Sequence, residues 1–522
     1  MSRSRTLWLP VLWGCFLVRL LFYSSMLPLW EGYDEWSHFA VVRAVASGQM
    51  LPPRDAPVPR DVEASMQSAP VPWEMRYLPP PAFSEDDFWK LPAQARAERQ
   101  AAFRAIPAAW AHETGTGNLK AYEALQPPLY YWLMAPVLRL ASGLSLAGQV
   151  AVLRWASVLL ASLALPLVFA LALTVFADER AALASAAVVA LMPGLALDVA
   201  RIGNDSLSMV LFTFLTLMLR RPEPDDWRMG AVLGLGLLSK VFFLTAVPAI
   251  FLVRGWRSWK ALAVAAAISG WWYARNLVTT GTLTGLSESV MLRDLGAWGV
   301  LGRASTLNWR TAADSILFSH LYFGGWSSLT VRSWMYHLFY AVALVAAVGL
   351  VRRWHERPVQ VLAAVYALFW LGELYNALLE WVSKGLPGSM GWYLYAVVGA
   401  EVVLCVAGLM AILPARLRPW AAPAGAVLFA LLDLYTVHAV EIPYYTGMIH
   451  RKPNGSPGTL HMADFVSVGW SGAFERLSMF QFAPRAMLAL LWAAYLGATV
   501  LGITLAFKVR FDTSSKLGNR NL

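Results

Sequence analysis

The sequence predicts an all-α membrane protein that crosses the bilayer many times. Of its 522 residues, 58% are hydrophobic and only 14% are charged, a balance that excludes an ordinary soluble globular protein. Many apolar runs approach the roughly 20 residues that a helix needs to span the hydrocarbon core of a bilayer. Because these runs lack the alternation of polar and apolar residues that marks barrel strands, helices are the expected spanning structure.

The formal net charge of +10 does not indicate nucleic-acid binding. Cationic clusters are expected on the cytoplasmic loops of a membrane protein, where they fix its orientation. The two cysteines, Cys15 and Cys405, lie in apolar runs and predict no disulfide framework. The sequence has no HEXXH, CXXC, Gly-x-Ser-x-Gly or Walker pattern, so any chemistry has to be sought in other polar residues.

Three polar segments separate the apolar runs and are predicted to face outside, namely 29–126, 277–331 and 441–484. The first apolar run ends at Pro28, and a later run ends in WWYARN at Asn276. The other expected runs are 129–146, 150–176, 181–196, 206–220, 228–253, 335–351, 359–380, 393–413, 420–440 and 485–507. Within the first polar segment, 34–50 and 92–110 are predicted to be surface helices, and the Pro-rich stretch 51–81 is predicted to be coil.

The topology between residues 129 and 253 has two solutions. If Asn204–Asp205 lies outside, 228–253 must form a short hairpin with Lys240 near the outer surface, because the basic turn Arg254–Lys260 is inside. One of the runs 129–146 and 150–176 then does not fully span. The simpler count makes every run a span and puts Asn204–Asp205 inside.

The stretch EGYDEWSHF, residues 31–39, holds the first candidate site. In a helix, Asp34 and His38 are four residues apart and Glu35 and His38 are three apart, so these pairs share a face. Carboxylates at a membrane surface, surrounded by aromatic residues, indicate a site. The alternative is an aromatic-belt anchor whose charges face lipid headgroups.

Further polar residues lie in or beside apolar runs, where their presence requires an explanation. Lys240 lies in the middle of an apolar run, where a charge costs several kcal/mol and requires a partner or a polar cavity, unless it snorkels. Arg201, Asn204 and Asp205 form either a site or a plain turn in which Asp205 begins a helix.

Two more pairs are candidates on weaker grounds. Arg275 and Asn276, at the end of an apolar run, belong to a site or act as a stop signal at the outer surface. Tyr130 and Tyr131 follow a Pro-rich helix start and are candidate binding residues.

Five motifs resemble, in order, segments of the GT-C glycosyltransferases, which include the protein O-mannosyltransferases and the lipid A aminoarabinose transferases of families 39 and 83. The first is the Asp-Glu pair followed by His-Phe. The others are QPPLYY (Gln126–Tyr131), RIGNDSL (Arg201–Leu207), LLSKVFFLTAVP (Leu237–Pro248) and WWYARNLVTTGTLTG (Trp271–Gly285). The late G-R-Y-L-x-P motif of the family has GWYLYA (Gly391–Ala396) as its counterpart here, without the arginine.

This resemblance implies a GT-C fold with about 11–13 transmembrane helices and a long first extracytoplasmic loop that carries surface helices. It implies a catalytic module at 1–290, including loop 29–126, and a variable transmembrane region at 291–522. The implied reaction moves a sugar from a polyprenyl-phosphate-sugar donor to an acceptor hydroxyl with inversion, on the extracytoplasmic face of the inner (plasma) membrane. It also favours an outside Asn204–Asp205 and a shallow Lys240.

The resemblance assigns roles as well. Asp34 aligns with the catalytic Asp of the family and is the expected general base. Glu35 is the second expected catalytic residue, and Glu35 and His38 would orient the base, touch the acceptor or hold a divalent cation, whose involvement stays open. Lys240 and Arg275 are candidates for the donor phosphate. The expected substrate-binding set is His38, Tyr130, Tyr131, Arg201, Asn204, Asp205, Lys240, Arg275 and Asn276.

The acceptor stays open among a glycan, a lipid and a protein, and no nucleic-acid partner is expected. One alternative is a lipid-linked-sugar transporter or flippase. A second is a scaffold of envelope assembly without catalysis, and a third is a ligase-type enzyme that uses a diphosphate-linked donor.

Overall fold

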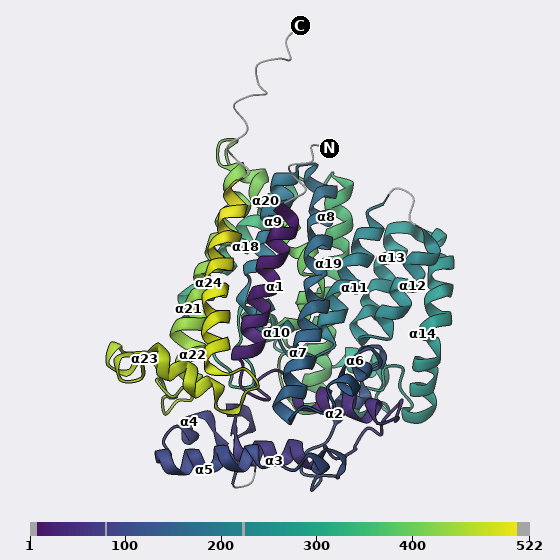
Figure 1. Ribbon diagram of the computed structural model, residues 1–522. Helices are drawn as coiled ribbons and strands as arrows, with labels where there is room; N and C mark the ends of the chain where they lie inside the picture. Colours follow the sequence, from purple (N-terminus) through teal and green to yellow (C-terminus); the bar gives the residue numbers. More distant parts are fainter. Residues whose placement is uncertain (1–7, 79–80, 222–224, 509–522) are drawn as a thin grey trace.

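The structure, a computed structural model, describes residues 8–78, 81–221 and 225–508. Long helices run side by side in one bundle, and short helices of the polar segments cover one end of it (Figure 1). This arrangement confirms the predicted all-α polytopic class.

The bundle helices are α1 (Trp8–Met26), α6 (Leu129–Leu140), α7 (Leu146–Ser162), α8 (Ala164–Phe176), α9 (Glu179–Leu191), α10 (Pro193–Val199), α11 (Asp205–Leu219), α12 (Asp226–Leu237), α13 (Ala246–Arg254), α14 (Trp259–Thr280), α18 (Ser333–Val351), α19 (Arg357–Lys384), α20 (Val398–Ile412), α21 (Ala421–Tyr435) and α24 (Arg485–Lys508). The covering helices are α2 (Glu35–Ala46), α3 (Arg60–Ser68), α4 (Glu85–Phe88), α5 (Ala93–Arg104), α15 (Ser287–Met291), α16 (Gly296–Gly302), α17 (Trp309–Leu321), α22 (Ile442–Tyr445) and α23 (Met462–Leu477).

Short helical turns and one strand pair complete the described chain. The turns are η1 (Trp73–Met75), η2 (Ala108–His112), η3 (Tyr122–Leu125), η4 (Val241–Thr245), η5 (Gly255–Ser258), η6 (Ala304–Thr306), η7 (Gly391–Val397), η8 (Arg418–Trp420), η9 (Thr436–Glu441) and η10 (Ser478–Phe480). The strands β1 (Pro70–Val71) and β2 (Phe83–Ser84) pair in parallel, Pro70 opposite Phe83.

By length and composition, eight helical segments of the described chain could cross a membrane, or nine if the bent pair α9–α10 is one span. The predicted number of about 11–13 is larger because it includes shorter apolar helices. Three of these, α6, α11 and α12, have 12 to 15 residues and are about 18–22 Å long at 1.5 Å per residue. They lie in the bundle without reaching the usual span length.

The structure agrees with the first of the two topologies. α7 and α8 form one apolar segment of 31 residues, whereas α6 is a 12-residue helix too short to span. α12 and α13 form a short hairpin, and Lys240 is the residue that precedes η4 at its turn. Lys240 makes an ion pair with Asp205, and the backbone N–H of Ile202 donates to Glu35. Asn204–Asp205 and Lys240 therefore lie at the end of the bundle where loop 29–126 lies.

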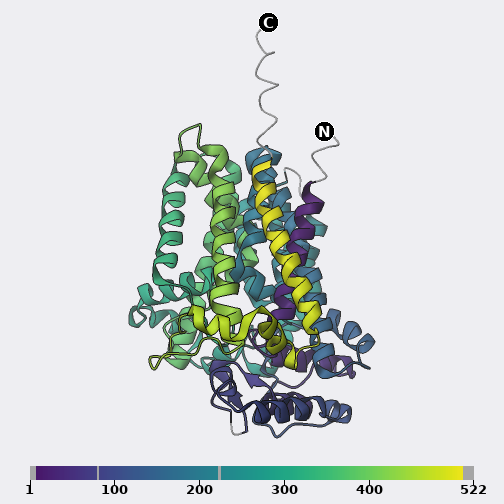
Figure 2. The same cartoon turned by 60° about the vertical axis from the view of Figure 1, so that its left-hand side comes forward.

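A fully buried ion pair joins α1 to α21, and hydrogen bonds from the same network reach α24, the last described helix. Arg19 of α1 donates to both carboxylate oxygens of Asp433 in α21, at 2.8 and 2.9 Å, and to Thr499 of α24 at 2.7 Å. Tyr23 and Tyr495 donate to the same carboxylate. Figure 2 shows α24 in yellow close to α1 in purple. A polar donor within the hydrocarbon core of a bilayer needs a hydrogen-bond partner. The network therefore fixes how α1, α21 and α24 pack against one another.

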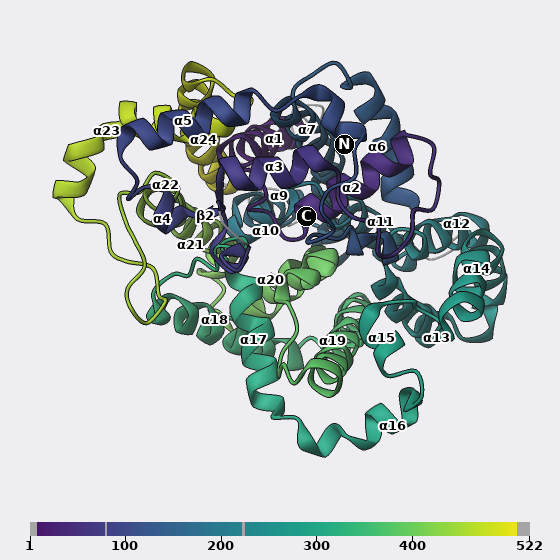
Figure 3. The same cartoon turned by 90° about the horizontal axis from the view of Figure 1, so that it is seen from below.

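Buried carboxylates join the three polar segments into one layer, which is seen from below in Figure 3. Glu31 accepts hydrogen bonds from the backbone N–H of Ser327 at 2.7 Å and from its hydroxyl at 2.8 Å. Asp86 accepts from Tyr444 at 2.7 Å and from the backbone N–H of Arg451 at 2.6 Å. Burial raises the pKa of Glu31 to about 8.

The predicted coil at 51–81 is wrong in part, because it contains α3. This helix has only nine residues and begins after Pro59, so its local signal is weak. Tertiary packing holds it instead: Val62 and Met66 are buried, and Asp61 pairs with Arg43 of α2 at 2.6 Å. The predicted surface helices at 34–50 and 92–110 correspond to α2 and α5.

Candidate active site

Asp34 lies at the turn between α1 and α2, in an unusual backbone conformation. Its φ of 57° and ψ of 13° are left-handed, a region that non-glycine residues seldom adopt and that Asp tolerates better than most. The hydroxyl of Tyr122 donates a hydrogen bond to its Oδ1. Burial raises the pKa of Asp34 above its ordinary value, although this hydrogen bond and nearby cations oppose the rise. Backbone strain of this kind is often found at functional sites.

Glu35 next to it is held by Arg154 of α7. The guanidinium donates to both carboxylate oxygens at 2.7 and 2.6 Å, and the backbone N–H of Ile202 donates to Oε1 at 3.1 Å. Arg154 also donates to the carbonyls of Ser24, Leu27 and Pro28, which end α1 and begin the turn. Glu35 thus ties the turn that carries Asp34 to two other parts of the bundle.

A second ionic group lies at the start of α11. Arg201 donates through Nη2 to Asp198 at 2.8 Å and to Asp205 at 2.7 Å. Lys240 pairs with the other oxygen of Asp205. All four side chains are almost fully buried. The charge of Lys240, which the sequence singled out because it requires a partner, is therefore matched by Asp205.

The two groups are neighbours. Arg201, Lys240 and Asp205 are close enough to influence the pKa of Asp34. The guanidinium of Arg201 lies 5.5 Å from the ring centre of Tyr33, and its side chain packs against Gly32. A Cβ atom built at Gly32 would come within 2.5 Å of the Arg201 Cβ, so only glycine allows this approach. The stretch 31–39 and the RIGNDSL turn thus form one site.

Arg201 is not fully satisfied within this site. Its Nε and Nη1 atoms are buried and have no hydrogen-bond partner among the described residues. The same is true of the side-chain oxygens Asn204 Oδ1 and Asp198 Oδ2. Because buried polar groups in native proteins are nearly always paired with protein, water or a ligand, these atoms are candidates for contact with water or a polar ligand.

His38 faces a different set of polar groups. Its Nδ1 is 2.9 Å from the hydroxyl of Tyr131, which itself donates to the backbone carbonyl of Glu123 at 3.1 Å. His38 Nε2 is 3.7 Å from the Glu123 carboxylate. Burial lowers the pKa of His38 and raises that of Glu123. The side chains of His38 and Glu123 can both form hydrogen bonds with hydroxyl groups.

Tyr130 and Asn204 support the RIGNDSL turn. The Tyr130 hydroxyl lies 2.7 Å from Ser157 Oγ and accepts a hydrogen bond from the backbone N–H of Gly203 at 3.0 Å. The amide of Asn204 donates to the carbonyl of Ser239 at 3.1 Å, which precedes Lys240. The predicted binding residues here thus also position the backbone that carries Arg201 and Lys240.

The structure does not bring Arg275 and Asn276 into hydrogen-bond contact with this group. The Arg275 guanidinium lies 5.2 Å from the ring centre of Trp272 and has no ion pair within the described part of the chain. Asn276 donates to the carbonyl of Thr284 at 3.0 Å and closes the loop that follows α14.

The sequence interpretation did not assign four further residues to the site, which are Tyr122, Glu123, Arg154 and Tyr393. The Lys240 ammonium lies 4.8 Å from the ring centre of Tyr393, within GWYLYA, the counterpart of the late family motif. A charge within the apolar run 150–176 was the available signal for Arg154, as it was for Lys240.

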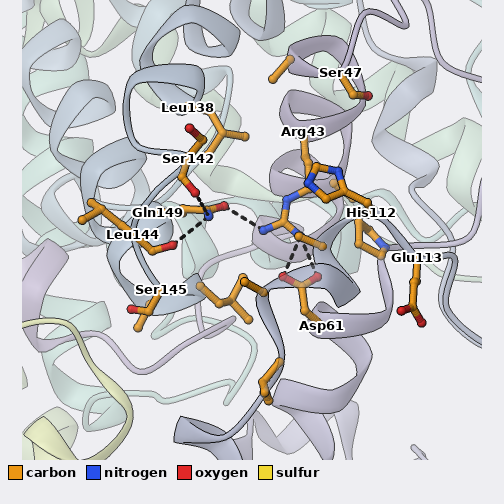
Figure 4. A pocket seen from close by; sticks show the side chains of 18 of the residues that line it. Arg43, Ser47, Asp61, His112, Glu113, Leu138, Ser142, Leu144, Ser145 and Gln149 are labelled. Carbon is orange, nitrogen blue, oxygen red and sulfur yellow. Dashed lines mark hydrogen bonds and ion pairs between the residues drawn. The ribbon is translucent and has the colours of Figure 1, made fainter.

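Within residues 8–78, 81–221 and 225–508, no group of three or more His, Cys, Asp or Glu side chains could hold a metal ion. Glu35 and His38, the predicted candidates, have the partners described above. A cavity of about 890 Å³ lies along the C-terminal half of α2 (Figure 4), and its lining does not include Asp34, Arg201 or Lys240.

The profile of the family described as dolichyl-phosphate-mannose-protein mannosyltransferase matches residues 125–271. This match confirms the predicted resemblance to GT-C glycosyltransferases over that segment. Two solved structures are similar to the chain: ArnT from Cupriavidus metallidurans in the apo state and the same protein bound to undecaprenyl phosphate. Both are 15% identical and cover 90% of this chain. The alignments cover 75% and 77% of those chains, with TM-scores of 0.41 and 0.40. No curated protein sequence matches the chain.

Proposed function

We propose that this protein is a membrane glycosyltransferase of the GT-C type that transfers a sugar from a polyprenyl-phosphate donor to an acceptor hydroxyl. The family match over residues 125–271 supports this class of enzyme. The observation that carries the proposal is the convergence of Asp34 with Arg201, whose buried donors lack partners. A carboxylate base beside unpaired anion-binding groups is what such a transfer requires.

Asp34 acts as the general base. As the acceptor oxygen attacks the anomeric carbon, its proton passes to a carboxylate oxygen of Asp34. The bond between that carbon and the phosphate oxygen breaks, and the lipid phosphate leaves with the electron pair. Tyr122 orients the carboxylate. Glu35 positions the turn through Arg154 and takes this indirect role rather than a catalytic one.

Arg201 and Lys240 bind the leaving phosphate. The unpaired Nε and Nη1 of Arg201 are the donors that we assign to phosphate oxygens. Lys240 adds a second positive charge, and Asp205 holds both cations in place. In this assignment Arg201 replaces Arg275, which makes no contact with these groups among the described residues.

The donor class, the stereochemistry and the side of the membrane follow from this assignment. The description of the matching family names a dolichyl-phosphate sugar, so we assign a donor with a single lipid phosphate. A base and a phosphate site on opposite sides of the anomeric carbon invert it. The basic turns Arg254–Lys260 and Arg352–Arg357 lie between bundle helices at the end away from the site, which favours the extracytoplasmic face of the inner membrane.

His38, Tyr131, Glu123 and Tyr393 are the residues that we assign to sugar or acceptor hydroxyls. The acceptor stays open among a glycan, a lipid and a protein. No step of the reaction is assigned to a divalent cation, and activity that survives chelation is the expected outcome of adding EDTA to the assay.

The test uses the purified full chain with a synthetic polyprenyl-phosphate sugar and measures release of the lipid phosphate. Asp34→Asn removes the base and is expected to lower the rate by about 10²–10⁴-fold, with unchanged expression and melting temperature. Asp294→Asn changes a carboxylate whose side chain is 93% exposed and serves as the matched control. Near-normal activity of Asp34→Asn would contradict the base assignment.

The same assay separates the alternatives. Turnover with a diphosphate-linked sugar but not with the monophosphate would indicate the ligase-type enzyme. Movement of the intact lipid-linked sugar across vesicles, without release of lipid phosphate, would indicate a transporter.

A further inference from the structure

The cavity of about 890 Å³ along α2 lies apart from the candidate active site. α2 carries Asp34 at its beginning and Arg43 nine residues later, about 14 Å along the helix axis. The cavity is enclosed by the second half of α2, the α5–η2 segment, the α6–α7 turn and η10. Its volume falls in the range of roughly 300–1,000 Å³ that is typical of small-molecule sites.

The cavity wall holds three arginines, from three different helices. Figure 4 shows Arg43 of α2, whose Nη1 donates to both oxygens of Asp61 at 2.6 and 2.8 Å and whose Nη2 donates to Gln149 at 2.9 Å. The other two are Arg104 of α5 and Arg139 of α6. Arg43 is thus already neutralised, and the charge available to a ligand comes from Arg104 and Arg139.

Those two arginines have no carboxylate partner in the described part of the chain. Arg139 uses Nε and Nη2 on the carbonyls of Ala46 and Val45, at 2.8 and 3.4 Å, and retains its charge. The second carboxylate of the wall, Glu113, is paired with Arg60, outside the cavity. The cavity therefore presents a net positive wall, together with hydroxyl and amide groups such as Ser47, Ser142 and Gln149.

One part of the cavity rim is apolar, beside exposed polar residues such as Ser142 and Ser145. Leu144 and Phe482 belong to its lining and are 40% and 41% exposed. The ring of Phe482 lies 5.9 Å from that of Trp155, the first residue of a stripe along α7. Trp155, Leu159 and Leu163 follow at intervals of four residues, so they share a helix face, and the two leucines are 53% and 46% exposed. This stripe lies in a candidate membrane span.

We propose that this cavity binds the phosphate-bearing head of a membrane lipid, whose acyl chains lie along the α7 stripe. Arg104 and Arg139 bind the phosphate, and the hydroxyl and amide groups bind the polar remainder of the head. A water-soluble phosphate compound would explain the arginines, but it would not explain the exposed Leu144 and Phe482 at the rim, beside a stripe that continues into a membrane span. The site does not use the residues assigned to the donor phosphate.

The test measures lipid bound to the delipidated full chain by native mass spectrometry. Phosphatidylglycerol is expected to bind at least fivefold more than phosphatidylcholine with the same acyl chains. Arg104→Gln, at an exposed position where folding is not at risk, is expected to lower phosphatidylglycerol binding at least fivefold. Binding of polyprenyl phosphate, assigned to Arg201 and Lys240, is expected to stay unchanged.

Two further variants and one competitor test where the lipid binds and whether a water-soluble phosphate compound can replace it. Leu144→Glu, which puts a negative charge at the rim, is expected to abolish phosphatidylglycerol binding while leaving the arginines intact. Arg310→Gln changes a cation whose side chain is 92% exposed and is expected to have no effect. Equal loss in Arg310→Gln, unchanged binding in both cavity variants, or full displacement of the lipid by equimolar glycerol 3-phosphate would overturn the proposal.

Discussion

Two buried arginines in the same bundle have opposite surroundings. Arg19 donates to Asp433, Thr499 and backbone carbonyls, so all its nitrogens have partners. Arg201 shares one nitrogen between two carboxylates, and its other two have no partner within the described residues. Burial and charge are alike in the two places. In our proposal, incomplete pairing rather than burial of a charge separates Arg201, which binds a ligand, from Arg19, which belongs to a structural ion pair.

The largest expected effect separates the two arginines directly. Arg19→Gln leaves Asp433 buried without its cation and is expected to lower the free energy of unfolding by about 3–5 kcal/mol. Polyprenyl phosphate should still raise the melting temperature of that variant, because its site is intact. Arg201→Gln removes the phosphate donors and should abolish this ligand-induced rise, which reaches about 2.7 kcal/mol of stabilisation at 100 times Kd.

The measurement is the melting temperature of each purified variant with and without polyprenyl phosphate. A ligand response that disappears in Arg19→Gln and persists in Arg201→Gln would reverse the interpretation of the two arginines.

A smaller effect is expected at Lys240. Lys240→Gln removes one cation from the phosphate site but leaves Asp205 paired with Arg201. A charged hydrogen bond contributes about 1.5–3 kcal/mol, so the Kd for the polyprenyl-phosphate sugar should rise about 10- to 100-fold. Lys384→Gln changes a lysine that pairs with Glu288 and Glu380 and should leave Kd unchanged. Equal affinity in the Lys240 variant and the wild type would remove Lys240 from the site.

The smallest expected effect concerns the pH dependence of activity. The base must be ionised, so the rate should rise with pH through the raised pKa of Asp34. Tyr122 stabilises the ionised form, and Tyr122→Phe removes this hydrogen bond and raises that pKa further. The acidic limb of the rate profile should therefore move to higher pH by up to about one unit.

The profile is measured as initial rate against pH for the wild type and for Tyr122→Phe, with the largely exposed Tyr77→Phe as the control. A limb that moves to lower pH, or that moves equally in both variants, would contradict the assigned contact.

The sequence predicted those parts of the molecule that have a local cause. Apolar runs predicted the spanning helices, and the basic turn at Arg254–Lys260 required a hairpin with Lys240 at its turn in one of the two predicted topologies. The helix that begins at Glu35 lies within the predicted surface helix at 34–50. A lysine in an apolar run needed a partner on energetic grounds alone, but the structure identified that partner as Asp205.

The parts that were missed depend on contacts between residues far apart in the chain. Arg154 reaches Glu35 across 119 positions, and Arg19 reaches Asp433 across 414. No local sequence pattern predicts such a pair. α3 was missed for the same reason, since its nine residues are stabilised by packing and by the Arg43–Asp61 pair rather than by propensity.

Arg154 has a consequence for how the lipid environment acts on this protein. Arg154 donates hydrogen bonds to three backbone carbonyls where the first span ends, and it pairs with the carboxylate of Glu35, the residue after Asp34. If this span tilts to match a thinner bilayer, the turn that carries Asp34, the proposed base, moves with it. The turnover rate should depend on the thickness of the surrounding bilayer even when its surface charge is held constant.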